Sequence, residues 1–103
     1  MTRKISLILL FTLLALAGTA QAGGDAAAGE AKAAECADCH GANGEGDGAG
    51  TPAIAGLDEA KHVEMLKGFQ SGKREGDMMP MMVEALSEQD MADLAAYYAT
   101  LGK

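Results

Sequence analysis

Two cysteines and a histidine lie close enough along the chain to act on one bound group. Cys36 and Cys39 are three positions apart, and His40 directly follows the second cysteine. This spacing is typical of covalent haem attachment, in which each thiol forms a thioether to a haem vinyl group and the adjacent imidazole ligates the iron. The motif therefore predicts one covalently bound haem c, held by these three residues.

Two other chemistries also use cysteine pairs. A thioredoxin-like dithiol is expected in a βαβ setting, and the sequence shows no strand-like alternation of apolar and polar residues. A zinc site needs four ligands, and the two cysteines together with His40 and His62 fit no usual finger spacing. Haem attachment is therefore the favoured interpretation.

The first 22 residues differ in composition from the rest. Arg3 and Lys4 precede an apolar run over residues 5–17, and a small-residue pattern ends at Ala22. This order is typical of a secretory signal peptide, and the apolar run is short against the roughly 20 residues that a membrane anchor needs. We expect export to the periplasm, cleavage after Ala22 and one mature domain, residues 23–103.

The chain is acidic, with 15 Asp and Glu against 8 Lys and Arg and a formal net charge of −7. Removal of residues 1–22 would make the charge −9, so nucleic acid is not expected as a partner. An acidic surface suits solubility, and it equally suits steering toward a basic docking patch on another protein.

Few aromatic side chains are available to build a core, because residues 23–103 contain one Phe and two Tyr. Burying on the order of 400 Å² of haem macrocycle at about 25 cal/mol per Å² would contribute roughly 10 kcal/mol. That contribution is comparable with the whole stability of a small domain. The sequence therefore predicts that a haem forms most of the core.

Three segments have helical patterns. Residues 25–36 are rich in alanine and carry Gly29 in their interior. Residues 57–70 place apolar side chains at 63, 66 and 69 after a capping residue, Asp58. Residues 87–102 begin with Ser87 in a capping-box arrangement and have one apolar face. We predict an all-α domain of three principal helices with loops around the haem.

His62 lies between charged neighbours, Lys61 and Glu64, in the second of these segments. We therefore expect an exposed histidine there rather than a second haem ligand. Six glycines among the sixteen residues 41–56 predict a loop. This loop begins like a calcium-binding loop, but Ile54 occupies the position where a bidentate Glu is needed.

Residues 78–82 contain four methionines and a proline. Methionines of this kind could fill a core or bind Cu(I) through their thioethers. They could also supply a thioether to haem iron opposite His40, the pairing that raises the haem potential in electron carriers. A bound haem would favour the third interpretation.

The motifs together resemble the class I cytochromes c, most closely the short bacterial monohaem members of the c-553 type. The resemblance spans residues 23–103. It depends on the haem motif, on Pro52 twelve residues after His40, on Met79 and Pro80 shortly before Leu86, and on the Leu-Ala-Ala-Tyr sequence at 94–97.

The resemblance implies a role for each matching position. His40 would be the proximal iron ligand, with the Pro52 carbonyl accepting its Nδ1 proton. Met79 would be the distal ligand, with Met82 as the runner-up. Arg74 would lie near the haem propionates, and Gly29 with Tyr97 would mark a close crossing of the first and last helices.

The implied function is one-electron transfer between exported or membrane-facing redox proteins, without catalysis. We expect a monomer that meets a redox donor and an acceptor in brief, charge-steered encounters, and that reaches a membrane only through partner complexes. The alternative is a haem-bearing electron-transfer subunit of a larger oxidoreductase. A haem gas sensor with a displaceable methionine and an exported copper binder are further alternatives.

Overall fold

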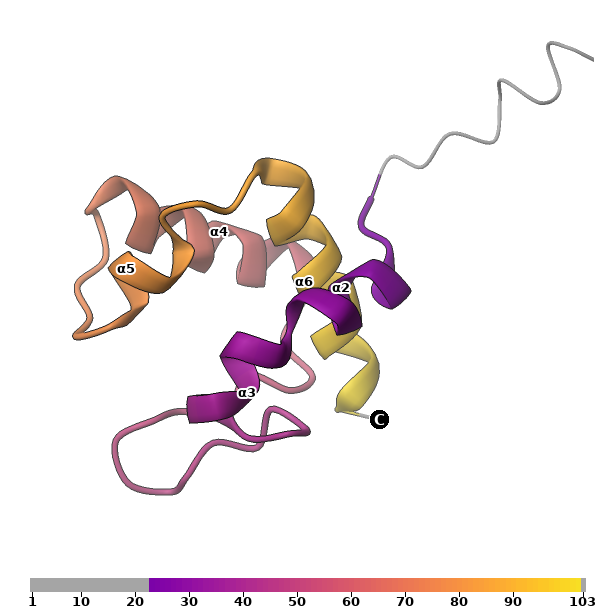
Figure 1. Ribbon diagram of the computed structural model, residues 1–103, viewed down its shortest axis with the longest axis horizontal. Helices are drawn as coiled ribbons and strands as arrows, with labels where there is room; N and C mark the ends of the chain where they lie inside the picture. The colour runs from indigo at the N-terminus through magenta and orange to yellow at the C-terminus, as the bar shows by residue number, and fades with distance from the viewer. Residues whose placement is uncertain (1–22, 103) are drawn as a thin grey trace, which may run out of the picture.

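The computed structural model describes residues 23–102, and the predicted signal peptide lies outside them. Regular structure in these residues is entirely helical, which confirms the all-α prediction (Figure 1). None of the helices in this part of the chain has the length and apolar character needed to cross a bilayer. The five helices are α2 (Ala26–Lys32), α3 (Ala34–His40), α4 (Glu59–Ser71), α5 (Met79–Val83) and α6 (Glu88–Leu101).

The first predicted helix is divided into α2 and α3. Asp25 caps α2, since its Oδ1 accepts hydrogen bonds from the amides of Ala27 at 2.9 Å and Ala28 at 3.3 Å. At Ala33 the chain tightens, because its amide donates to the Glu30 carbonyl at 3.2 Å. The segment that carries the cysteines therefore has a helix of its own.

α2 crosses α6 at very close range (Figure 1). Gly29 is buried at the crossing, where an added methyl group would collide with the Asp93 carbonyl and lie 2.8 Å from Tyr97 Cβ. This contact confirms the expected approach of Gly29 and Tyr97. It also explains why a residue with poor helix propensity lies inside a helix.

A buried carboxylate joins the same two helices. Asp93 is 3% exposed, and its oxygens accept hydrogen bonds from the Asp25 amide, from Gln89 Nε2 and from Lys32 Nζ, each at 2.8 Å. These donors, led by the Lys32 ammonium, lower the pKa of Asp93 from 3.8 to about 2. The ionised carboxylate therefore stabilises the folded state.

α4 and α6 begin as the sequence predicts. The Asp58 side chain accepts from the Lys61 amide at the start of α4. Ser87 and Asp90 form a reciprocal capping box at the start of α6. α5 was not predicted, although Pro80 in its first turn is a residue that helix starts favour.

The buried side chains form two separate clusters rather than one core. The first consists of Ala33, Ile54, Leu94 and Tyr98, and half-buried Cys36 packs against it. The second consists of Leu66, Val83 and Met91, and half-buried Met79 packs against it. Leu86 packs against both clusters.

Substitution Gly29→Ala should destabilise the protein, because the methyl group must push α2 away from α6. We expect a loss of about 1–3 kcal/mol in the free energy of unfolding of the haem-bound protein, the usual cost of overpacking. Denaturant unfolding measures this loss. Gly23→Ala is the control, because nothing lies within 4 Å of a methyl group there and the residue does not line the cavity. Equal losses of stability in both variants would contradict the close approach of α2 and α6 at Gly29.

Asp93→Asn should change how stability depends on pH. Because folding lowers the pKa of Asp93, its stabilisation is present above its ordinary pKa of 3.8 and is lost as the pH falls toward 2. The variant should therefore lose less stability than wild type between pH 5 and about 2. Glu30→Gln, an exposed change on α2, should keep the wild-type slope of the unfolding free energy against pH. If Asp93→Asn also keeps that slope, the lowered pKa of Asp93 does not contribute to the pH dependence of stability.

Candidate haem-binding site

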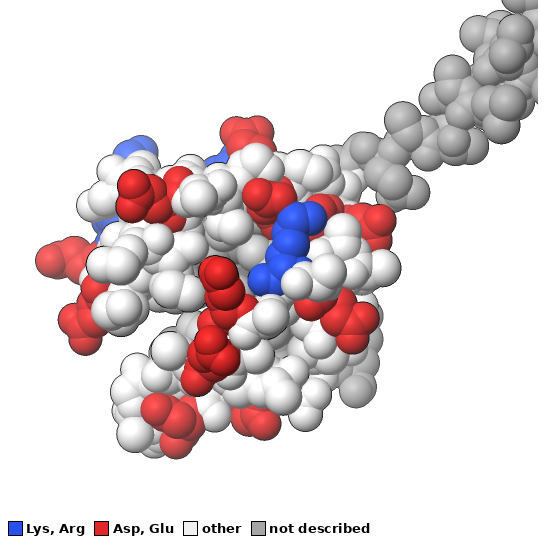
Figure 2. Space-filling model, in the orientation of Figure 1, with Lys and Arg blue, Asp and Glu red and all other residues white. Residues whose placement is uncertain are grey.

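A cavity of about 640 Å³ lies between the two clusters. This volume is within the range of cavities that hold cofactors and ligands. Figure 2 shows its opening as a notch in the molecule, between the loop that follows α3 and the region of α4 and α5. Its walls include the haem-motif residues Cys36, Cys39 and His40, residues 50–52 of the loop, and Met78, Met79 and Met82.

α3 brings the three motif residues to one side of the cavity. Cys36 lies three positions before Cys39 and four before His40, so the three side chains share a helix face. Cys36 is half-buried and Cys39 is exposed, and neither is in a disulfide. α3 ends at Gly41, whose φ of 94° suits glycine.

The buried His40 ring is held by one hydrogen bond. His40 Nδ1 lies 2.8 Å from the Pro52 carbonyl oxygen, as the resemblance implied. Because a carbonyl can only accept, Nδ1 carries a hydrogen, and in the neutral ring the lone pair is then on Nε2. The nitrogen that could ligate a metal is therefore Nε2, and the hydrogen bond fixes the direction of the ring.

Asp47 shapes the loop that presents Pro52. Its Oδ1 accepts hydrogen bonds from the amides of Ala49, Gly50 and Thr51 at 2.8–3.1 Å. These amides, with Ala49 first, lower the pKa of the Asp47 carboxyl. In the sequence, Asp47 lies in the loop that begins like a calcium-binding loop, but an aspartate before a turn is also the usual sign of such a side-chain cap.

The methionines of residues 78–82 differ in exposure. Met78 is 55% exposed, Met81 66% and Met82 36%, whereas Met79 is half-buried and packs against the Leu66 cluster. Met79 and Met82 both line the cavity, and Met81 does not. The four thioethers are thus in different positions, although they are neighbours in sequence.

Arg74 also lines the cavity. Its guanidinium carbon lies 5.3 Å from the centre of the Phe69 ring, a cation–π distance. The backbone amide of Arg74 donates to the Gly68 carbonyl at 3.0 Å. A cation is therefore available at this edge of the cavity.

The expectation of an exposed His62 was wrong. His62 is 4% exposed, lines the cavity and lies with its ring centre 5.8 Å from that of Tyr98. Its Nδ1 is buried without a hydrogen-bond partner in the described part of the chain. Burial, followed by the nearby His40, lowers the pKa of the His62 imidazole, so the neutral form is favoured.

Burial also disfavours charge on two other groups near the motif. It raises the pKa of the Cys36 thiol and that of the Tyr98 hydroxyl. Tyr98 is 1% exposed and belongs to the same cluster as Cys36. The environment of the first cysteine is therefore apolar and suits a neutral thioether.

The residues around the cavity fit a covalently bound haem. Two thiols lie near an imidazole whose Nε2 is available, thioethers lie on another wall, and the buried Nδ1 of His62 has no hydrogen-bond partner within residues 23–102. A group that combines vinyl carbons, a metal and an apolar ring matches this set of side chains.

Comparison with known proteins gives the family. The cytochrome c family model matches residues 26–102. Cytochrome c4 of Pseudomonas aeruginosa is 44% identical over 94 residues, which are 91% of this chain and 47% of that protein. Cytochrome c-554(548) of Halomonas halodenitrificans is 39% identical over 80 residues, 75% of this chain and 96% of that protein.

A solved structure of thiosulfate dehydrogenase from Marichromatium purpuratum has a similar fold. It matches 79% of this chain and 20% of its own with a TM-score of 0.71 and 33% identity. The chain therefore belongs to the cytochrome c family. Membership of this family implies a covalently bound haem c. The chain spans about half the length of the cytochrome c4 relative.

Replacing His62 should alter the pH dependence of stability. Because folding lowers the His62 pKa below its ordinary value of 6.5, the unfolded chain binds more protons and wild type loses stability as the pH falls through 6.5. His62→Leu should reduce this loss. Unfolding free energies of both haem-bound proteins between pH 7.5 and 5 test the prediction, and parallel curves would contradict it.

Proposed function

We propose that the mature chain, residues 23–103, is a monomeric periplasmic one-electron carrier with one haem c. His40 would be the proximal iron ligand and Met79 the distal ligand. The observation that carries this proposal is that one cavity has the available nitrogen of His40 on the α3 side and the thioether of half-buried Met79 from α5. Figure 1 places α3 and α5 in different parts of the molecule.

The bound haem would supply a reversible one-electron couple. The protein would keep both iron positions occupied, because an imidazole fixed by Pro52 and a thioether from α5 leave no open position for oxygen or peroxide. Covalent attachment through Cys36 and Cys39 would retain the cofactor outside the cytoplasm. Arg74 would pair with a haem propionate at the cavity edge.

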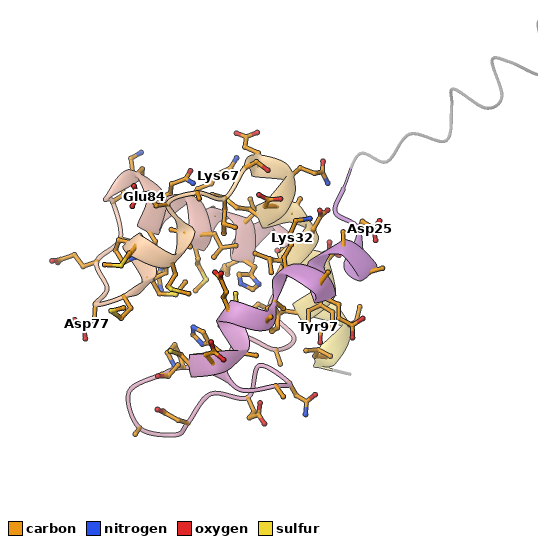
Figure 3. The ribbon with its side chains drawn as sticks, viewed as in Figure 1. Asp25, Lys32, Lys67, Asp77, Glu84 and Tyr97 are labelled. Carbon is orange, nitrogen blue, oxygen red and sulfur yellow. The ribbon has the colours of Figure 1, made fainter. Side chains whose placement is uncertain are left out.

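The exposed methionines support a docking role for this side of the molecule. Met78, Met81 and Met82 expose apolar thioethers next to the cavity, and exposed acidic residues accompany them at Glu75, Asp77 and Glu84. Figure 3 shows Asp77 and Glu84 on the side of the molecule that carries α5. A redox partner with an apolar centre and a basic rim would complement this surface.

The second candidate is an electron-transfer subunit of a larger oxidoreductase. A protein of Thiomonas intermedia called thiosulfate dehydrogenase electron acceptor is 41% identical over 76 residues, and the Marichromatium dehydrogenase contains a similar fold. A permanent complex that survives purification would support this candidate, whereas a freely dissociating monomer would support the carrier.

Met79→Ala should remove the charge-transfer absorption of a methionine–iron bond from the oxidised protein and lower the reduction potential, because the thioether raises it. The reduced variant should also bind carbon monoxide at neutral pH, which wild type should not. Visible spectra and a redox titration measure these effects.

Met82→Ala and Met81→Ala are the matched variants. Met81→Ala should leave the spectrum unchanged, because Met81 does not line the cavity. If Met82→Ala loses the absorption and Met79→Ala keeps it, Met82 is the ligand instead. Ready binding of carbon monoxide to the wild type would favour a gas sensor over a carrier.

A further inference from the structure

One side-chain amide ties the last turn of α4 to the end of α5. Gln70 Nε2 donates to the Val83 carbonyl at 2.9 Å and to the Leu86 carbonyl at 2.8 Å, with a longer contact of 3.4 Å to the Glu84 carbonyl. An amide nitrogen has two hydrogens. The two short hydrogen bonds therefore use its full capacity on the segment that follows the methionines.

α5 has little local support of its own. It contains five residues, and its N-cap Met78 makes no side-chain capping hydrogen bond. A helix of this length is unstable alone, and the carbonyls of its last turn lack partners within the helix. Among residues 23–102, Gln70 is the side chain that donates to the Val83 carbonyl in this turn and to the Leu86 carbonyl beyond it. The Leu86 amide also donates to the Val83 carbonyl, at 3.1 Å. Val83, which is 2% exposed, and half-buried Met79 also attach α5, through the Leu66 cluster.

Met79 lies at the opposite end of α5 from Val83. Four residues of helix span about 6 Å, so the anchored end and the thioether-bearing end are close together and move as one short rigid piece. Any tilt of α5 about its anchored end would shift the Met79 thioether in the cavity.

We propose that Gln70 is a positioning residue for the Met79 thioether. Its amide holds the end of α5 on α4 and so keeps the thioether in place against water and other small ligands. The inference rests on the proposed function, in which Met79 is the distal haem ligand. Gln70 does not line the cavity, so it acts through α5 and not on the haem.

The test compares Gln70→Leu with Gln89→Leu in the haem-bound protein. Both substitutions replace a glutamine by a leucine of similar size and so remove a side-chain amide. The Gln70 amide donates to carbonyls at the end of α5 and beyond it, whereas the Gln89 amide donates to Asp93 at the α2–α6 crossing. Imidazole binding to the oxidised protein, followed in the visible spectrum, reports displacement of the thioether. Denaturant unfolding reports general destabilisation of each variant.

Gln70→Leu should bind imidazole about three- to tenfold more tightly than wild type, the change expected from losing one or two hydrogen bonds that favour the closed state. It should also lose the methionine–iron absorption at lower pH on alkaline titration. Gln89→Leu should keep wild-type values in both measurements while its unfolding midpoint falls. Equal imidazole affinity in the two variants would overturn the proposal.

Met79→Ala separates this inference from the proposed function. If wild type has the methionine–iron absorption and Met79→Ala loses it, the ligand is established, and the two glutamine variants then decide the role of Gln70. If Met79→Ala keeps the absorption, the ligand assignment fails and the role of Gln70 toward Met79 fails with it.

Discussion

The crossing of α2 and α6 at Gly29 is the contact on which the rest of the domain depends. A cavity separates the two small clusters of buried side chains, so direct packing between helices has to hold the two sides of the domain together. At the crossing, Gly29 has no side chain to keep the backbones of α2 and α6 apart, and the buried Asp93 carboxylate accepts a hydrogen bond from the Asp25 amide. α3 continues from α2 after one tight turn at Ala33. The crossing of α2 and α6 therefore also determines where α3 places the two cysteines.

The two sides of the cavity are built in different ways. On the α3 side, the proposed iron ligand His40 is part of a helix, its ring is held by the Pro52 carbonyl, and the loop is held by Asp47. On the other side, α5 is short and attached through Val83 and the Gln70 amide. The proposed proximal ligand, His40, therefore has a firmer support than the proposed distal ligand, Met79.

Sequence patterns predicted those features that local chemistry determines. The caps at Asp58 and Ser87 and the role of Gly29 follow from residue types at fixed spacing. His62 was misplaced because its sequence neighbours are charged, although it lies four positions before buried Leu66 and therefore on the same helix face. Gln70 could not have been found in this way, since a hydrogen bond from a side chain to a distant carbonyl leaves no periodic pattern.

The exposure of three methionines next to the cavity has a chemical consequence. Peroxide converts accessible thioethers to sulfoxides, which are polar and which reductases can restore. Met78, Met81 and Met82 are more accessible than half-buried Met79. Oxidants would therefore reach these three sulfurs before that of Met79, and they would make the surface of this segment polar while the Met79 thioether is still intact.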